Sequence, residues 1–419
     1  MSDWRHITLG DLAKSKGCKI QTGPFGSQLH KHEYQAEGIG VVNPTHMADR
    51  RVSHDTVPCV SAEVAQRLSK HQVRPGDLLF ARRGEIGRHA LITESERGWL
   101  CGTGCFLVRV NGPESDSTYI SFYLSTDESV EWLNRHAAGV VMPNLSNNVL
   151  QRVPVALPPL PEQKKIAHIL STMQRAIEAQ ERIIQTTTEL KKALMHKLFT
   201  EGLRHEPQKQ TEIGPVPQSW EVVRCEDVCD TISVGIVVKP SSYYVKEGVP
   251  AFRSQNVRED RIQPEPMVYI SEESNNGPVK KSKLSAGDVL IVRTGYPGTS
   301  CVVPPEFDGS NCIDLIFVRP NKEKLRSHYL SRFFNSDAAK VQVQAGKIGL
   351  AQQHFNVGAV KNTQMPLPPP DQQDEIVSHL ELIDSKHNLT TSKRNTLQDL
   401  FRTLLHQLMT AQIRTQGFE

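Results

Sequence analysis

The sequence lacks three features that would place it in a class at once: a long hydrophobic run, a dense set of cysteines and a strong excess of charge of one sign. No stretch approaches 18 consecutive apolar residues, which excludes a membrane-spanning helix, and the start MSDWRHITLG has no signal-peptide core. Eight cysteines among 419 residues predict reduced thiols in a cytoplasmic protein. With a net charge of +3, any nucleic-acid binding would depend on local basic patches.

Motifs of common catalytic centres are also missing. The sequence has no GxxxxGK[ST] phosphate loop, no HExxH pair and no CxxC pair. An amino-methyltransferase holds its target amine with Asn/Asp-Pro-Pro-aromatic, and the closest string, Asn43-Pro44-Thr45-His46, does not match. The sequence therefore predicts no catalytic residue and no metal site, and it favours a binding function over an enzymatic one.

The chain repeats itself at an offset of about 210 residues. GDLLFARRGEIG at 76–87 returns as GDVLIVRTGYPG at 287–298. ALPPLPEQKKIAHIL at 156–170 returns as PLPPPDQQDEIVSHL at 366–380, and LMHKLFT at 194–200 returns as LLHQLMT at 404–410. This period is too long for a solenoid and predicts a duplicated unit with internal pseudo-twofold symmetry.

Each copy begins with a part rich in glycine, proline and short apolar runs and ends in one long helical segment. The predicted fold class is α+β, with two similar mixed α/β globules separated by two long helices. Pro161 suits a first helical turn, and Asp371 is a candidate N-cap. The predicted boundaries are 1–155 and 219–365 for the globules, 156–204 and 366–412 for the helices, and 205–218 for a linker.

Both helical segments carry a seam with alternating spacings of four and three residues, which is the pattern of a coiled coil. Its apolar members are Ile166, Leu170, Met173, Ile177, Ile184, Leu194 and Leu198 in the first helix, and Ile376, Leu380, Ile383, Leu397, Phe401, Leu404 and Leu408 in the second. Either each helix packs on its own globule, or the helices pair with each other or with a partner chain. The matched register favours pairing, and polar members such as Lys191 and His387 could fix an antiparallel alignment or lie in solvent where the helices splay.

Basic, amide and aromatic residues near glycines form the candidate binding surface, because arginine, asparagine and glutamine read base edges and lysine and serine suit phosphates. The candidates are Gly23, Phe25, Ser27, Gln28, Asn43, Thr45, His46, Arg82 and Arg83 in the first copy, and Lys239, Ser241, Tyr243, Tyr244, Arg253, Gln255, Asn256, Arg293, Thr294 and Lys347 in the second. A single cluster of this kind is more often a solvated surface. The case is stronger for Arg82, Arg83 and Arg293, which follow a predicted buried strand and precede a glycine.

Together these strings resemble the specificity (S) subunits of Type I restriction-modification enzymes over essentially the full length. The residues that carry the resemblance are IQTGPFGSQLH (20–30), MPNLSNNVLQRVPVALPPLPEQKKIAHIL (142–170), TEIGPVPQSWEVV (211–223) and MPLPPPDQQDEIVSHL (365–380). The most specific feature is the Leu-Pro-Pro lead into a long helix, which occurs twice. In the second copy Asp371-Gln372 replaces Glu162-Gln163.

The resemblance implies two target recognition domains, each reading one half of a bipartite double-stranded DNA site. It implies that two antiparallel helices set the unread spacer and dock two methyltransferase subunits, and through them restriction subunits. Such a chain is non-catalytic and cytoplasmic, in a bacterium or archaeon. S-adenosylmethionine, ATP and Mg²⁺ are expected on the partner subunits and no cofactor on this chain.

Three alternatives remain open at this point. The chain could serve a related system with a fused nuclease-methyltransferase, or it could be a self-contained DNA methyltransferase or nuclease with degenerate motifs. It could also be an assembly scaffold that no longer reads DNA. In that last case, replacing Arg82 or Arg293 by alanine would leave DNA affinity unchanged.

Overall fold

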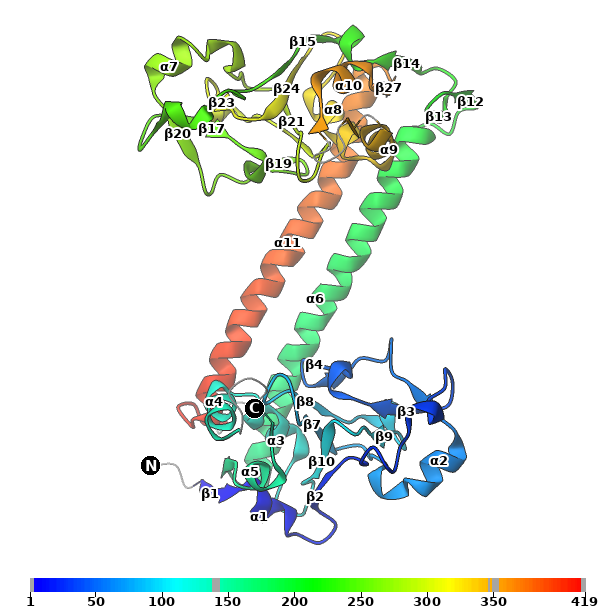
Figure 1. Cartoon of the computed structure of the whole chain (residues 1–419), viewed down its shortest axis with the longest axis vertical. Helices are drawn as coiled ribbons and strands as arrows, with labels where there is room; N and C mark the ends of the chain where they lie inside the picture. Colours follow the sequence, from blue (N-terminus) through cyan, green and yellow to red (C-terminus); the bar gives the residue numbers. More distant parts are fainter. Residues whose placement is uncertain (1–3, 138–143, 346, 349–353, 416–419) are drawn as a thin grey trace. The chain divides into compact units, whose positions relative to one another are not determined.

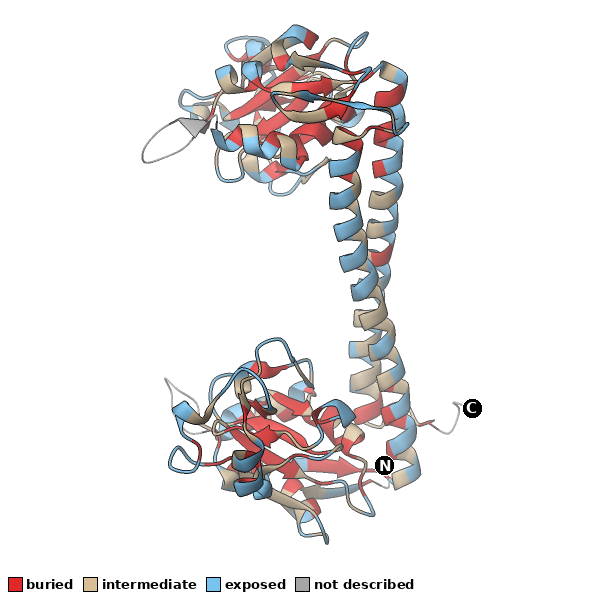
Figure 2. Ribbon diagram, turned by 90° about the vertical axis from the view of Figure 1, so that its right-hand side faces the viewer, coloured by how far each residue is buried: buried red, intermediate tan, exposed pale blue. Residues whose placement is uncertain are grey.

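The computed structural model describes residues 4–137, 144–345, 347–348 and 354–415. The chain folds as two compact units, and each combines one globule with one half of each long helix. Unit 1 comprises Met1–Glu181 and Ser392–Glu419, and unit 2 comprises Arg182–Thr391. Many of the elements are labelled in Figure 1, and Figure 2 shows the buried residues concentrated in the strands inside each globule.

The strands of unit 1 are short and lie in several small sheets. They are β1 (Arg5–Thr8), β2 (Lys19–Thr22), β3 (Ile39–Val42), β4 (Met47–Ala48), β5 (Arg51–Val52), β6 (Cys59–Val60), β7 (Leu78–Ala81), β8 (His89–Leu91), β9 (Leu100–Cys101), β10 (Cys105–Arg109) and β11 (Pro154–Leu157). The main sheet is antiparallel with strand order β2-β10-β7-β8, and a second sheet has the order β6-β3-β9. The continuous apolar run LLFA of β7 is buried along its whole length, as expected for a strand covered on both faces.

Unit 2 repeats this plan. Its strands are β12 (Gln208–Thr211), β13 (Gly214–Pro217), β14 (Glu221–Arg224), β15 (Cys229–Val234), β16 (Tyr244–Val245), β17 (Val249–Phe252), β18 (Val257–Arg258), β19 (Arg261–Ile262), β20 (Val268–Ile270), β21 (Val289–Val292), β22 (Ser300–Val302), β23 (Asn311–Cys312), β24 (Leu315–Pro320), β25 (Lys347–Ile348), β26 (His354–Phe355) and β27 (Gln364–Leu367). The main sheet β15-β24-β21-β22 has the strand order of its counterpart in unit 1, and β14 pairs with β27 as β1 pairs with β11. The duplication predicted from the sequence is therefore a duplication of topology.

Short helices cover these sheets and carry side-chain caps at several of their starts. They are α1 (Leu9–Ala13), α2 (Ala62–Arg67), α3 (Ser117–Leu124), α4 (Asp127–His136) and α5 (Asn147–Gln151) in unit 1, and α7 (Glu272–Asn276), α8 (Ser327–Asn335), α9 (Asp337–Ala345) and α10 (Val357–Asn362) in unit 2. The side chains of Asp116 and Thr126, for example, accept hydrogen bonds from backbone N–H groups in the first turns of α3 and α4.

The two long helices are α6 (Leu160–Thr200) and α11 (Pro370–Met409), and both run through the division between the units. Asp371 lies inside the first turn of α11 and is not its N-cap, because the helix already begins at Pro370. Gly202, with a φ of 70°, lies just beyond the end of α6. The predicted linker 205–218 contains the hairpin β12–β13, so it is ordered structure and not an extended connection.

A buried glutamine fastens the first turn of α6 to the globule of unit 1. The Nε2 of Gln163 donates to the carbonyls of Glu114 and Pro158 at 2.9 and 2.8 Å. Its Oε1 accepts from the N–H of Asp116 at 2.9 Å. The side chain is fully buried. If it were removed, the three backbone groups that it contacts would lose their hydrogen-bonding partner and could not replace it with water.

Gln373 makes the same three bonds in unit 2. Its Nε2 donates to the carbonyls of Lys324 and Pro368, and its Oε1 accepts from the N–H of Arg326, each at 2.8 Å. The structural counterpart of Gln163 is thus Gln373, and the sequence-based pairing with Gln372 is wrong by one position. The amide common to both copies is explained by this attachment.

All of the predicted seam positions are buried or half-buried. In unit 1, Ile166 of α6 shares an apolar cluster with Leu408 of α11 and with Tyr119 of the globule. In unit 2, Leu198 of α6 lies in one cluster with Ile376 of α11. The start of one helix meets the end of the other, so the pair is antiparallel within each unit. Both packing alternatives hold, because the same clusters join helix to helix and helix to globule.

We expect Gln373→Ala to lower the free energy of unfolding by about 2–3 kcal/mol, because it leaves buried donors and acceptors without partners. Urea unfolding followed by circular dichroism measures the effect. The control is Gln185→Ala, which removes an exposed glutamine from α6 and is expected to change stability by less than about 0.5 kcal/mol. Equal effects of the two substitutions would contradict a fastening role for Gln373.

Candidate nucleic-acid interface

Two loops with the same backbone follow the central strands β7 and β21, at residues 82–88 and 293–299. Gly84 and Gly295 have φ values of 85° and 88°, and Gly87 and Gly298 have values of 90° and 91°. A side chain at these positions would be strained, which explains why the glycines recur at the same places in both copies. The loops are therefore a shared frame on which the residues between the glycines differ.

The arginines that open these loops have different surroundings. The guanidinium carbon of Arg82 lies 5.2 Å from the ring centroid of Phe106, whereas Nη1 of Arg293 lies 2.5 Å from Oδ1 of Asp314. At the position of Asp314 the first copy has Gly104. Within the described residues Arg82 has no acidic partner, so its charge is available to an anion, while that of Arg293 is partly neutralised.

A second pair of loops forms single 3-10 turns, Pro44–His46 and Ser254–Asn256. The Nδ1 of His46 accepts from the N–H of Asn43 at 3.0 Å, and the Oδ1 of Asn256 accepts from the N–H of Arg253 at 2.9 Å. Both side chains are buried, and burial lowers the pKa of His46. His46 and Asn256 thus hold their turns from inside, and their predicted contact with DNA stays a prediction.

Each of these turns presents one exposed side chain, Thr45 in unit 1 and Gln255 in unit 2, at equivalent positions of the repeat. Asn43 and Arg253 are half-buried beside them. The Nε2 of Gln255 lies 3.2 Å from the carbonyl of Pro266, which it can exchange for another acceptor at little cost.

Gly23 lies at a close approach of two backbone segments. A side chain there would place Cβ 1.9 Å from the carbonyl oxygen of Gly102, so the glycine lets two backbone segments meet. The residues that follow it are accessible: Phe25 is 56% exposed, and Ser27 and Gln28 are exposed.

The remaining predicted residues lie on loops with varied exposure. Arg83, Lys239, Ser241 and Tyr244 are exposed, and Tyr243 and Thr294 are half-buried. Lys347 lies in β25, and its side chain falls outside the described part of the chain.

Sequence reasoning missed Tyr296, which is 84% exposed, and Val237 and Val238, which are 49% and 73% exposed. Tyr296 stands between the two turn glycines of its loop, and the repeat places Glu85 at the same position in unit 1. The signal was present in the sequence, because a residue between two such glycines lies at the loop tip. Exposed aromatic and apolar side chains can make contacts to base edges that charged residues cannot.

The described residues contain no group of histidine, cysteine, aspartate or glutamate side chains arranged to hold a metal ion. All eight cysteines are free thiols, in accord with the expectation from composition. Within the described part of the chain, no helix combines the length and the apolar character needed to cross a bilayer.

The chain belongs to the family defined by the Type I restriction modification DNA specificity domain, whose model matches residues 1–188 and 217–399. The two matches confirm the family and the duplication predicted from the sequence.

Relatives with this description come from archaea and bacteria. The type I restriction enzyme MjaVIII specificity subunit of Methanocaldococcus jannaschii is 26% identical over 72% of this chain and 71% of its own length. The type I restriction enzyme EcoBI specificity subunit of Escherichia coli is 23% identical, over 82% of this chain and 76% of its own.

Solved structures share the fold over nearly the whole chain. The S subunit of the Type I restriction-modification system from M. genitalium matches with a TM-score of 0.59 and 16% identity, over 97% of this chain and 96% of that one. A chain from a study of complex assembly and conformational transition of the type I R-M system matches with a TM-score of 0.56 and 19% identity, over 97% of both chains.

We expect Asn256→Ala to lower the free energy of unfolding by about 1–3 kcal/mol, because Asn256 is buried and also donates to the carbonyls of Gln263 and Pro266, both at 3.0 Å. The neighbouring control Gln255→Ala removes an exposed side chain and is expected to change it by less than about 0.5 kcal/mol. Chemical denaturation of both variants decides the point. A variant Asn256→Ala as stable as the wild type would contradict this structural role of Asn256.

Proposed function

We propose that this chain is the DNA-recognition subunit of a Type I restriction-modification complex, in which each globule reads one half of a bipartite target. The observation that carries the proposal is the duplicated loop frame with different exposed residues. Thr45 and Gln255 occupy one matched position, and Glu85 and Tyr296 occupy another. Because different side chains favour different base edges, two such globules suit two different half-sites. Family membership supports this reading.

We propose further that α6 and α11 set the distance between the half-sites and dock two methyltransferase subunits. A helix of 41 residues is about 60 Å long at 1.5 Å per residue. The seam was predicted to serve both helix pairing and partner docking, but its residues are turned toward the helix pair and the globules. Docking therefore falls to side chains outside the seam, such as Leu190, Leu382 and Leu389, which are 53%, 71% and 53% exposed.

The chain itself is proposed to be non-catalytic. S-adenosylmethionine, ATP and Mg²⁺ would bind to the methyltransferase and restriction subunits, which this chain directs to DNA. Support comes from the sequence, which has no phosphate-loop motif and no amine-holding tetrapeptide.

Methylome sequencing tests the proposal directly. A host that carries this chain with its neighbouring methyltransferase gene is compared with the same host without this chain. We expect a new methylated motif of two short defined halves around a fixed gap, because two readers joined in one chain by long helices would bind a split site. A continuous motif would contradict the two-reader proposal, and methylation that does not depend on this chain would contradict a role in recognition.

The proposed role of the helices predicts the effect of an insertion. Four residues inserted between Thr186 and Thr188 lengthen α6 by about 6 Å, a little under two base-pair steps. We expect both half-sites to stay the same and the gap to grow, as read by methylome sequencing. The control is the same insertion in the turn between β12 and β13, which lengthens neither helix and is expected to leave the gap unchanged. Altered half-sites with an unaltered gap would refute the spacer role.

A further inference from the structure

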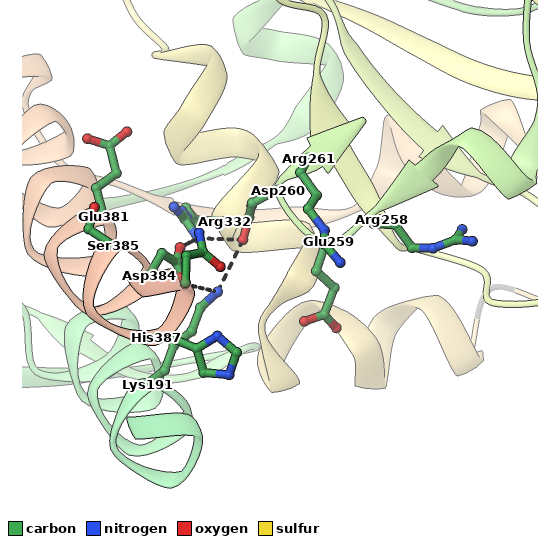
Figure 3. A pocket seen from close by; sticks show the side chains of 11 residues that line it. Lys191, Arg258, Glu259, Asp260, Arg261, Arg332, Glu381, Asp384, Ser385 and His387 are labelled. Atoms are coloured by element: carbon green, nitrogen blue, oxygen red, sulfur yellow. Dashed lines mark hydrogen bonds and ion pairs between the residues drawn. The ribbon is translucent and has the colours of Figure 1, made fainter. Parts of the chain in front are cut away.

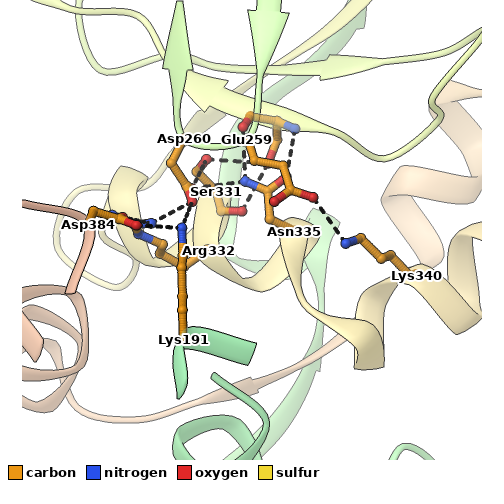
Figure 4. A network of polar contacts seen from close by, with 9 residues as sticks. Lys191, Glu259, Asp260, Ser331, Arg332, Asn335, Lys340 and Asp384 are labelled. Carbon is orange, nitrogen blue, oxygen red and sulfur yellow. Dashed lines mark hydrogen bonds and ion pairs between the residues drawn. The ribbon is translucent and has the colours of Figure 1, made fainter. Parts of the chain in front are cut away.

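Four charged side chains form a closed ring in unit 2, where the globule meets both long helices (Figures 3 and 4). Lys191 comes from α6, Asp384 from α11, Arg332 from α8, and Asp260 from the turn between β18 and β19. Arg332 contacts Asp260 and Asp384 at 2.5 and 2.6 Å. Lys191 contacts Asp384 and Asp260 at 2.7 and 3.7 Å. Every cation in the ring therefore meets both anions.

Asp260 is the member that joins the globule to the ring. It also accepts hydrogen bonds from the Oγ of Ser331 at 3.1 Å and from the Nδ2 of Asn335 at 2.9 Å (Figure 4). Its side chain is only 11% exposed, and its φ is 60° in a two-residue hairpin turn. A β-carbon in that region is strained, so the turn is held by the contacts of the carboxylate.

The same four positions meet in unit 1 with different chemistry. At the repeat offset of 210 residues, these positions correspond in order to those of the other copy: Asp260, Arg332, Asp384 and Lys191 align with Arg50, Phe122, Gln174 and Phe401. The guanidinium carbon of Arg50 lies 3.4 Å from the ring centroid of Phe122, and its Nη2 donates to Oε1 of Gln174. The rings of Phe122 and Phe401 are 6.0 Å apart.

The backbone at the turn is conserved between the units while the charge is inverted. Arg50 has a φ of 62°, against 60° for Asp260, and the turns join matched hairpins β4–β5 and β18–β19. Each hairpin is tied to its main sheet, by Leu91 N–H donating to the carbonyl of Arg50 and by Asp260 N–H donating to the carbonyl of Ser300, both at 2.9 Å. The matched backbone in both copies indicates that the contacts of the turn residue are part of the fold and not a chance surface interaction.

The two chemistries are mutually exclusive. An arginine at position 260 would face Arg332 and Lys191, and two uncompensated cations in a largely buried ring are strongly unfavourable. An aspartate at position 50 would place a carboxylate against the faces of aromatic rings, whose negative quadrupole repels it. Each turn residue therefore fits the partner side chains of its own copy and does not fit those of the other copy.

We propose that residues 50 and 260, with their three partners in each unit, form a reader junction that positions each DNA-reading globule on its own pair of helix segments. The turn Ser254–Asn256, with exposed Gln255, directly precedes β18, so the junction fixes the place of a proposed reading residue relative to α6 and α11. Because the side chains differ between the two junctions, the turn residue of one copy cannot replace that of the other. This inference rests on the proposed recognition function.

The experiment uses the full chain with its methyltransferase partner and a plasmid that carries the wild-type site and sites with a gap one base pair longer or shorter. Asp260→Arg is expected to reduce methylation of the wild-type site at least tenfold and to raise the share of methylation at the altered gaps. The fourfold variant K191F/D260R/R332F/D384Q transfers the unit 1 junction into unit 2, and it is expected to return methylation to within threefold of wild type with the original gap.

The matched control is Glu259→Arg, the same change of charge one residue away. Glu259 contacts Lys340 at 3.1 Å, and both side chains are about half exposed, so this variant is expected to methylate the wild-type site as well as the unchanged chain does. If Asp260→Arg does not fold, as judged by circular dichroism, Asp260→Asn serves in its place with a smaller loss and the same shift toward altered gaps.

Three results would contradict the proposed junction. The first is that Asp260→Arg methylates as well as the wild type, and the second is that the fourfold variant methylates no better than Asp260→Arg. The third is that methylation falls equally at every gap, which indicates lost stability without lost positioning. Failure of the underlying function is distinguishable, because then the unaltered chain itself would give no bipartite motif.

Discussion

Each unit depends on one apolar cluster to which the globule and both long helices contribute. In unit 1 this cluster joins Trp4 and Tyr119 of the globule to Leu170 of α6 and Leu408 of α11. Burial of apolar area is the dominant stabilising term in folding, and here it cannot be divided between a globule and a separate coiled coil. The helices therefore belong to the cores of the units. This is why the two compact units cut across the helices and do not follow the boundaries of the repeat.

Polar contacts then fix what apolar packing leaves free. An apolar cluster is non-directional, so the direction in which a helix leaves its globule requires groups with geometry. Gln163 and Gln373 supply three directed bonds each at the helix starts, and the four-residue rings around Arg50 and Asp260 supply a second point of attachment. The glutamine bonds are the same in both copies, whereas the turn residue changes from arginine to aspartate and its partners change with it. The first contact therefore holds the shared fold, and the second differs between the copies.

The loops that form the candidate interface show how far sequence patterns reach. The glycines after β7 and β21 predicted the loops correctly, since a turn with positive φ leaves a signature in residue type. Residue type did not reveal which side of a turn faces solvent. His46 and Asn256 have the hydrogen-bonding groups of readers, yet they satisfy the backbone of their own turns. Tyr296 went unnoticed because an aromatic residue suggests a core until its exposure is known.

The sequence by itself determined the duplication, the α+β class, the two long helices and their seam, because these depend on periodicity and on repeated local motifs. It also determined the family through strings that recur about 210 residues apart. Only the tertiary structure decided that Gln373 matches Gln163, that the seam is used up inside the units, and that Asp260, Arg332, Asp384 and Lys191 meet. Those four residues come from four separate elements, and proximity across such distances in the chain depends on packing, which no local pattern encodes.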